Sequence, residues 1–221
     1  MIRVLVVDDH AIVRQGLRRI LDEADGVCFG GEAANGVDAL KMMRTDKWDV
    51  VLLDISMPKK NGIDTLKQIM DCNKAAKVLI LSMYPEDQYA VRLMKAGASG
   101  YLTKETVPER LVEAIHNVVA GKKYISPTLA ELLLMECGAD SHKLPHELLS
   151  DREYQVLRLI GSGKSVSEIA DQLSLSVKTV STYRTHILEK IKLKNNAELI
   201  YYVMQNGLNE MNGSYGAARC L

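Results

Sequence analysis

The sequence lacks the features typical of a secreted protein, a small zinc-binding protein or a membrane-spanning protein. Its four cysteines, at positions 28, 72, 137 and 220, share no C-x-x-C spacing, which argues against a zinc ribbon or a redox pair. Free thiols without a disulfide framework are typical of a reducing compartment, so we expect a cytoplasmic protein. No apolar run approaches the ~18 residues of a membrane span, and no signal-peptide pattern precedes the strand-like residues that begin at position 2. We therefore expect no membrane partner.

Neither sign of charge is in excess. The chain holds 28 Lys and Arg residues against 28 Asp and Glu residues, so its formal net charge is zero. A uniform basic field that would attract nucleic acid is therefore absent, although local patches matter more for binding than the sum. With 221 residues, 47% of them hydrophobic, the chain is long enough for one large or two small domains, each with its own core.

An apolar run that ends in a carboxylate stands at the centre of the first half. Val50 to Leu53 are four consecutive apolar residues followed by Asp54, a pattern typical of a strand buried on both faces of a parallel sheet. Pro58 interrupts regular pairing soon after. Ligands bind to open parallel sheets outside the carboxyl ends of the strands. The pattern therefore places Asp54 in such a crevice.

Two further carboxylates reach the same edge of the predicted sheet. The strand pattern of residues 2–7 ends in Asp8 and Asp9. Clustered carboxylates repel each other and raise each other's pKa, so they need a compensating cation. Hard oxygen ligands with room left for water are typical of Mg²⁺ sites. His10 could add a ligand, but a histidine in this place more often opens the following helix.

Two later strand-like segments end in other polar groups. Residues 77–82 end in the hydroxyl of Ser82, and residues 100–104 end in the amine of Lys104. Acids, a hydroxyl and a fixed ammonium group at one edge suit a transient phosphoryl group, which a carboxylate can take up covalently. Strand and helix patterns alternate to residue 120, which predicts an α/β domain with a five-stranded parallel, flavodoxin-like sheet and helices on both faces.

The next segment reads as a connection between two domains. Leu129 to Cys137 is apolar enough for a short helix, and Gly138 and Pro145 flank a polar stretch. His142 and His146 have a spacing that can hold a metal on a helix, but Pro145 between them favours a solvated linker. We predict a first domain at 1–121, a partly helical linker at 122–146, a second domain at 147–208 and a disordered tail at 209–221.

The second domain is predicted to be small and all-α, with four helices. Ser150 and Ser165 are each followed three residues later by glutamate, which is the capping-box pattern of a helix start. Ser176 can cap a third helix after a tight turn, and a fourth helix follows at about 197–205. A helix, a short turn and a second helix are the arrangement that puts a recognition helix into the major groove of DNA.

The third of these helices divides into a buried and an outward face. Val180, Ile187 and Ile191 recur at helical spacing and predict one buried stripe. Residues 176–196 carry five Lys or Arg residues against a single Glu, a local excess that suits DNA phosphates. A solvated helix face would share that excess, but the preceding capped helix and short turn favour DNA contact.

The order and spacing of Asp8-Asp9, Asp54, Ser82 and Lys104 resemble those of a response-regulator receiver domain, over residues 1–120. The resemblance implies that Asp54 accepts a phosphoryl group from a sensor histidine kinase or a phosphotransfer protein. It further implies a bound Mg²⁺ held by Asp8, Asp9, Asp54 and the backbone carbonyl of Ser56, and a phosphate-contacting switch made of Ser82, Tyr101 and Lys104.

Three motifs in the last third resemble a LuxR-type helix-turn-helix: L-S-x-R-E from Leu149, G-K-S-x-x-E-I-A from Gly163, and L-S-x-K-T-V from Leu175. The chain as a whole is similar to a NarL/FixJ-class two-component response regulator, a DNA-binding transcriptional regulator that phosphorylation controls. The resemblance implies promoter DNA as a partner, with Ser181, Thr182 and Thr185 on base edges and Lys178, Thr179, Tyr183, Arg184 and Lys190 on the backbone. It also implies a homodimer on DNA, paired through Leu199, Ile200, Val203 and Met204.

Other classes of function fit the sequence less well. The segment from Gly161 to Ser165 hints at a phosphate-binding loop, but the motif needs a glycine where Arg158 stands, and a strand before it. A haloacid-dehalogenase-type phosphatase needs an acid two residues after Asp54, where Ser56 stands. We therefore expect no enzyme beyond self-directed phosphotransfer and autodephosphorylation at Asp54. A DNA binder with a degenerate receiver is disfavoured because every receiver position is present.

Overall fold

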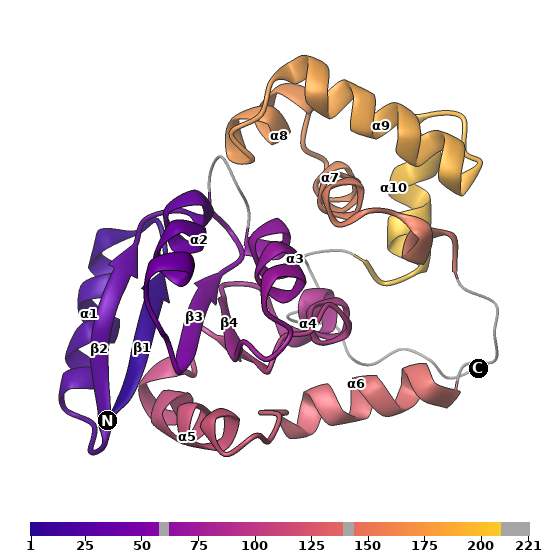
Figure 1. Ribbon diagram of the computed structural model, residues 1–221. Helices are drawn as coiled ribbons and strands as arrows, with labels where there is room; N and C mark the ends of the chain where they lie inside the picture. The colour runs from indigo at the N-terminus through magenta and orange to yellow at the C-terminus, as the bar shows by residue number, and fades with distance from the viewer. Residues whose placement is uncertain (58–61, 139–143, 209–221) are drawn as a thin grey trace. The chain divides into compact units, whose positions relative to one another are not determined.

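The computed structural model describes residues 1–57, 62–138 and 144–208, which form two compact units (Figure 1). Contacts between Cα atoms assign Met1–Ala139 to the first unit and Asp140–Leu221 to the second. The boundaries predicted at 121, 146 and 208 stay predictions. The predicted tail at 209–221, His142, and the polar stretch after Gly138 lie outside the described residues.

The first unit is built on a parallel sheet in which, among the described residues, five strands run in the order β2-β1-β3-β4-β5. A central position for β1 and β3 buries both faces of these strands, which explains their continuous apolar sequences. The strands are β1 (Ile2–Val7), β2 (Val27–Ala33), β3 (Val50–Asp54), β4 (Val78–Ser82) and β5 (Gly100–Thr103).

Helices cover both faces of this sheet, as predicted. One face carries α1 and α5, which share a core with alternate strand residues such as Val4, Leu52 and Leu79. Figure 1 shows α2 and α3 in front of the opposite face. Each fully buried Leu or Val contributes about 1.5–3 kcal/mol relative to an exposed one. The helices are α1 (Ala11–Asp22), α2 (Gly36–Thr45), α3 (Gly62–Cys72), α4 (Glu86–Lys95) and α5 (Val107–Val119).

A further helix, α6 (Pro127–Gly138), packs against α4 and belongs to the first unit. It covers the segment from Leu129 for which the sequence predicts a short helix, and Leu129 itself is fully buried. The α4 helix begins at Glu86, earlier than the apolar spacing from Val91 indicates. Its first turn is acidic and polar, which stabilises a helix N-terminus but gives no apolar periodicity.

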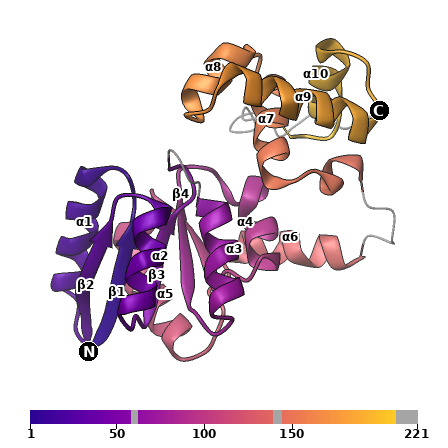
Figure 2. The same cartoon turned by 45° about the horizontal axis from the view of Figure 1, so that its top comes forward.

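The second unit is all helical, as predicted (Figure 2). Both capping boxes are formed, at Ser150 with Glu153 and at Ser165 with Glu168, and the Ser176 hydroxyl caps the recognition helix by accepting from the Thr179 amide. The elements are the 3-10 helix η1 (Pro145–Leu148), α7 (Asp151–Gly161), α8 (Val166–Gln172), α9 (Val177–Ile191) and α10 (Asn196–Gln205).

The packing of α10 against α7 is close. A Cβ atom on Gly161 would come within 2.3 Å of the Val203 side chain, so glycine permits this approach. The Gly161–Ser165 segment joins α7 to α8 as a turn between helices, with Gly163 at φ +85°, which agrees with the rejection of a phosphate-binding loop. No helix among the described residues is both long enough and apolar enough to cross a membrane.

Candidate functional site

Polar groups meet at the carboxyl edge of the first unit's sheet. Val7 pairs with Leu53 across β1 and β3, so the residues that follow, Asp8 and Asp54, stand side by side. Ser82 pairs with Thr103 across β4 and β5, which brings Lys104 to the same edge. The strand register therefore assembles groups that lie far apart in the sequence.

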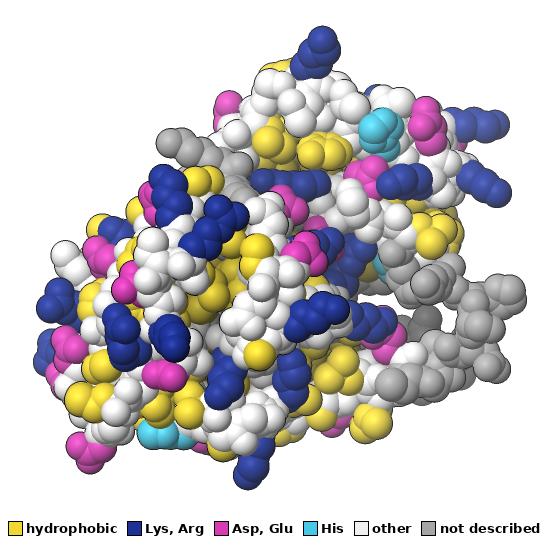
Figure 3. All heavy atoms as spheres, in the orientation of Figure 1, with side chains coloured by type: hydrophobic (Ala, Val, Ile, Leu, Met, Phe, Trp, Pro, Cys, Tyr) yellow, Lys and Arg dark blue, Asp and Glu magenta, His cyan; other side chains and the backbone are white. Residues whose placement is uncertain are grey.

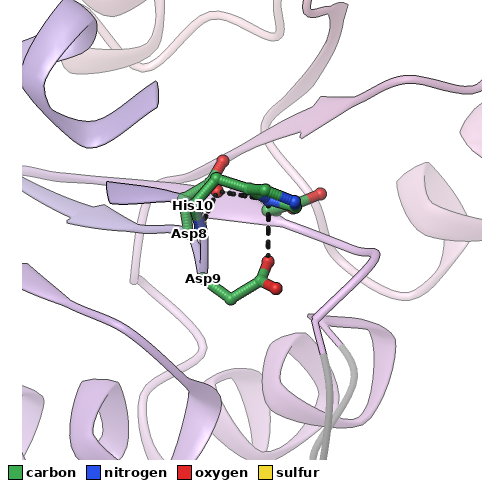
Figure 4. Close-up of side chains that lie close together, drawn as sticks. Asp8, Asp9 and His10 are labelled. Atoms are coloured by element: carbon green, nitrogen blue, oxygen red, sulfur yellow. Dashed lines mark hydrogen bonds and ion pairs between the residues drawn. The ribbon is translucent and has the colours of Figure 1, made fainter. Parts of the chain in front are cut away.

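Three carboxylates form the centre of this site. One ligand atom each from Asp8, Asp9, Asp54 and His10 lies within 4.8 Å of all the others. Asp8 and Asp54 are buried, with 1% and 0% of their surfaces exposed. Figure 4 shows Asp8, Asp9 and His10 at the start of α1, with the imidazole turned toward both carboxylates. Charged groups this deeply buried need a partner of opposite charge.

Lys104 supplies that partner. Its Nζ donates to Asp8 Oδ2 at 2.7 Å and to Asp54 Oδ2 at 2.9 Å, and 11% of its side chain is exposed. Burial raises the pKa of Asp54, although the charge of Lys104 and a hydrogen bond from the Ser56 amide oppose that rise. Burial acts to lower the pKa of Lys104, but Asp54 and Asp8 outweigh it and raise the pKa.

The carboxylates keep capacity for a cation. Asp9 Oδ1 is buried and accepts no hydrogen bond from the described residues. His10 Nδ1 lies 3.2 Å from Asp9 Oδ1, but this is an ion pair only when the imidazole is protonated. An exclusively oxygen donor set of carboxylates fits a hard divalent ion better than a soft one. His10 is the N-cap of α1 and its side chain is 60% exposed.

Two of the predicted switch residues, Ser82 and Tyr101, converge on the main chain of Tyr84. Ser82 is buried, and its Oγ accepts a hydrogen bond from the Tyr84 amide at 3.0 Å. The hydroxyl of Tyr101 donates to the Tyr84 carbonyl at 2.7 Å. Burial is the main reason why the pKa of Tyr101 is raised, so this side chain stays a neutral donor.

Sequence reasoning missed two features of this site. It did not place Lys104 between Asp8 and Asp54 before any phosphoryl group is present. It also gave no role to Tyr84, whose hydrogen bonds to Ser82 and Tyr101 both use main-chain atoms. Main-chain contacts leave no side-chain signature, so no sequence signal could have found them.

The second candidate site is the outward face of α9. Val180, Ile187 and Ile191 are buried, as the predicted stripe requires. Figure 3 shows Lys and Arg side chains projecting at the top and right, where Figure 1 draws α9. The predicted DNA-contacting residues of this helix divide by burial into exposed Lys178, Ser181, Thr182, Thr185 and Lys190, and half-buried Thr179, Tyr183 and Arg184.

Several of these side chains already have partners within the unit. Lys190 Nζ donates to both carboxylate oxygens of Glu153, at 2.9 and 2.6 Å. The Arg184 guanidinium donates to Asn196 Oδ1. The hydroxyls of Thr182 and Thr185 donate to the carbonyls one turn earlier, at 3.0 and 3.1 Å. Both threonines therefore present a methyl group and oxygen lone pairs to the outside.

The predicted dimer residues on α10 need correction. Leu199 and Val203 are fully buried within the second unit, because this stripe of α10 packs on α7. They are therefore not free to pair with another copy. Ile200 is half-buried and Met204 is exposed, as is Tyr201, which the prediction left out. His146, predicted to lie in a solvated linker, instead contacts the Tyr202 hydroxyl at 2.9 Å.

Comparison with known families identifies both parts of the chain. Residues 4–116 match the family described as response regulator receiver domain, and residues 147–203 match the bacterial regulatory proteins of the luxR family. The chain is a response regulator. It has a receiver domain and a LuxR-type DNA-binding domain, the combination of the NarL/FixJ class, and the predicted function class is confirmed.

This response regulator has relatives along nearly its whole length. It is 39% identical to response regulator UvrY of Escherichia coli K12 over 209 residues, which cover 94% of this chain and 96% of UvrY. It is 41% identical to response regulator GacA of Pseudomonas aeruginosa, covering 94% of this chain and 98% of GacA. A structure of RcsB from Salmonella enterica serovar Typhimurium, bound to promoter rprA with phosphomimetic BeF₃⁻, aligns with a TM-score of 0.61 at 25% identity, over 92% of this chain and 99% of that chain.

Proposed function

We propose that Asp54 is the phosphorylated residue, with a sensor histidine kinase or a phosphotransfer protein as donor. The observation that supports this assignment is the buried Asp54 carboxylate, which lies 2.9 Å from Lys104 at the carboxyl edge of the sheet. One carboxylate oxygen of Asp54 attacks phosphorus, the P–N bond to the donor's histidine breaks, and the imidazole leaves with its electron pair. Autodephosphorylation, in which water attacks the same phosphorus and releases inorganic phosphate, completes this self-directed chemistry.

Each neighbouring residue has a defined part in this proposal. Asp8, Asp9, Asp54 and the Ser56 carbonyl would hold Mg²⁺, and its positive charge would offset the repulsion between these carboxylates and an incoming phosphoryl group. Lys104 exchanges its bond to Asp54 for one to a phosphoryl oxygen. Ser82 donates a hydrogen bond to another phosphoryl oxygen, and Tyr101 follows it as the second half of the switch.

The output is binding to promoter DNA by a homodimer. Ser181, Thr182 and Thr185 meet base edges, while Lys178, Thr179, Tyr183, Arg184 and Lys190 contact the backbone. Solved structures of RcsB support DNA and dimers as partners, because they include an RcsB–DNA complex and two RcsB dimers bound to two parallel DNAs. Pairing uses the exposed side of α10, with Ile200 and Met204.

The phosphorylation assignment is tested by intact-mass measurement after incubation with a small-molecule phosphodonor. Wild-type protein is expected to gain one phosphoryl group when Mg²⁺ is present and far less when it is chelated. Asp54→Asn should gain none. Asp71→Asn, which removes an exposed carboxylate at the end of α3, is the matched control and should behave as wild type. Equal labelling of Asp54→Asn would refute the assignment.

A further inference from the structure

The beginning of α6 is tied to the beginning of α4 through one serine hydroxyl. Ser126 Oγ donates to Glu86 Oε2 at 2.5 Å, and Glu86 is the first residue of α4. The same oxygen accepts a hydrogen bond from the Leu129 amide at 3.0 Å, so Ser126 also caps α6, whose first residue is Pro127. Two helix starts therefore meet at a single atom.

Glu86, the partner of Ser126, lies close along the chain to the switch described above. Tyr84, two residues before Glu86, binds the Ser82 hydroxyl through its amide and the Tyr101 hydroxyl through its carbonyl. A single residue, Pro85, separates Tyr84 from α4, and its fixed φ leaves little slack. Any displacement of the Tyr84 main chain is therefore passed to Glu86.

The other tie between these helices is of a different kind. Lys95 Nζ lies 2.5 Å from Glu136 Oε1 near the far ends of α4 and α6, and the Lys95 side chain is 62% exposed. A long, exposed lysine follows its partner by changing rotamers and is screened by salt. The Ser126–Glu86 contact is half-buried, and the serine side chain has a single χ angle, so this contact has less freedom to follow a displacement.

We propose that Ser126 is a positioning residue that reports the state of the phosphorylation site to α6, the last described helix before the second unit. This inference rests on the proposed function of Asp54. When the Ser82 hydroxyl turns to a phosphoryl oxygen, it gives up the Tyr84 amide, and the segment from Tyr84 to Glu86 moves. The Glu86 carboxylate then moves relative to the Ser126 hydroxyl. The hydrogen bond from the Leu129 amide to Ser126, which caps α6, strengthens or weakens as a result.

The Ser126 hydroxyl can couple the two helices because it donates to one helix and accepts from the other. A serine hydroxyl has one proton to donate, and here it goes to Glu86 while the oxygen lone pair serves the Leu129 amide. Loss of the Glu86 contact frees the hydroxyl to rotate, and loss of an N-cap frays the first turn of a helix. Two discrete arrangements of one side chain are thus available, as a coupling between distant sites requires.

Amide hydrogen exchange of the full-length chain, with and without Mg²⁺ and beryllofluoride, tests the proposal. Two segments are followed: residues 50–57, which contain Asp54, and residues 129–136 of α6. In wild-type protein we expect beryllofluoride to change exchange in both segments, with a change of about fivefold or more in α6, the lower end of ordinary coupling between sites.

Two variants distinguish the Ser126–Glu86 hydrogen bond from the capping of α6 by Ser126. Glu86→Ala removes the acceptor on α4 but leaves Ser126 to cap α6, so segment 50–57 should respond and α6 should not. Ser126→Ala should also uncouple the segments, with faster basal exchange in α6. Asp87→Ala is the control, because Asp87 is an exposed acid of the same first turn and should leave both responses intact.

The outcomes distinguish the two proposals. If segment 50–57 shows no response in wild-type protein, the function proposed for Asp54 fails and the coupling fails with it. If segment 50–57 responds and α6 does not, or if α6 of Glu86→Ala responds as in wild type, the Ser126 coupling is overturned while the phosphorylation site stands.

Discussion

Lys104 is the residue on which the balance of charge in the receiver site depends. Its amine lies within hydrogen-bonding distance of both Asp8 and Asp54, and these two carboxylates are almost wholly buried. Removing one partner of a buried ion pair costs more than the pair contributes, since it leaves an uncompensated charge. The lysine is therefore part of the stability of the receiver as well as of its chemistry.

For this reason Lys104→Met should lower the free energy of unfolding of the first unit by about 3–5 kcal/mol in the absence of divalent ions. Mg²⁺ should recover part of that loss by compensating the same carboxylates. Urea unfolding followed by the fluorescence of Trp48, the single tryptophan of the chain, measures both effects. The control is Lys95→Met, which breaks an exposed ion pair and should cost at most about 1 kcal/mol. Similar losses in the two variants would contradict the role given to Lys104.

On the DNA-binding face, hydroxyl and amine groups are expected to act differently. Thr182→Val removes no charge and keeps the outward methyl group, while the lost hydroxyl proton was used inside the helix, so this variant should leave the salt slope of binding unchanged. Lys178 is exposed near the start of α9, and Lys178→Ala should weaken binding to all sequences alike and reduce the salt slope of binding by about 1. Fluorescence-anisotropy titrations over a range of salt concentrations measure both. A reduced salt slope in Thr182→Val, or an unchanged one in Lys178→Ala, would count against these assignments.

At the scale of elements, Glu153 joins α7 to α9. Its carboxylate accepts from the Ser150 amide at 2.8 Å as half of a capping box, and from Lys190. Burial acts to raise the pKa of Glu153, but hydrogen bonds from Lys190 and Ser150 outweigh it and hold the pKa below the ordinary value of 4.5. A lowered pKa means that this stabilisation is fully present above pH 4.5 and is lost as the pH falls through the folded-state value.

Glu153→Gln should consequently destabilise the second unit by about 2 kcal/mol at neutral pH, with a smaller difference from wild type in acid. Glu168→Gln alters the other capping box, which lies at the surface, and should have a much smaller effect. Thermal unfolding followed by circular dichroism at neutral and acidic pH compares the two. Equal shifts of the melting temperature would show that Glu153 acts as a cap alone.

The loop behind Asp54 depends on the close approach of α3. A Cβ atom on Gly62 would lie 2.0 Å from the Asp54 carbonyl oxygen and 2.6 Å from Ile55 Cα. Both are backbone atoms that cannot rotate away, so the end of β3 at Asp54, and Ile55 after it, must shift. The position therefore links a helix start directly to the site.

We expect Gly62→Ala to lower the stability of the first unit by about 1–3 kcal/mol, as overpacking does, and to weaken Mg²⁺ binding. Gly16→Ala in α1 is the matched control, because a Cβ there meets no described atom within 4 Å and alanine favours a helix by about 1 kcal/mol over glycine. Urea unfolding with and without Mg²⁺ gives both quantities. A stabilising effect of Gly62→Ala would contradict the geometry.

The spacing of apolar residues and the positions of helix-capping residues were enough to predict most helices and strands. The apolar run before Asp54, the two serine capping boxes and the stripe through Val180 each depend on local sequence, and each is formed as predicted. The orientation of α10 could not be predicted, since Leu199 has the same sequence pattern whether it packs within the unit or against a second copy. The pairing of Lys190 with Glu153, 37 residues away, likewise depends on tertiary packing.

At the scale of the whole molecule, two units with different chemistry share one chain. The first holds a buried cluster of acids with one lysine, and the second holds a helix with exposed cations and hydroxyls. Neither site explains why the other is present. We propose that the state of Asp54 changes the affinity of α9 for DNA, and this is the central claim.

That claim is tested most directly by fluorescence-anisotropy binding to promoter DNA, with and without a phosphodonor plus Mg²⁺, for wild type and Asp54→Asn. We predict that the phosphodonor tightens binding by wild-type protein about fivefold or more, in the ordinary range of coupling between sites, and that it leaves Asp54→Asn unchanged. Equal affinity in all four conditions would mean that the receiver does not control DNA binding, and would contradict the mechanism.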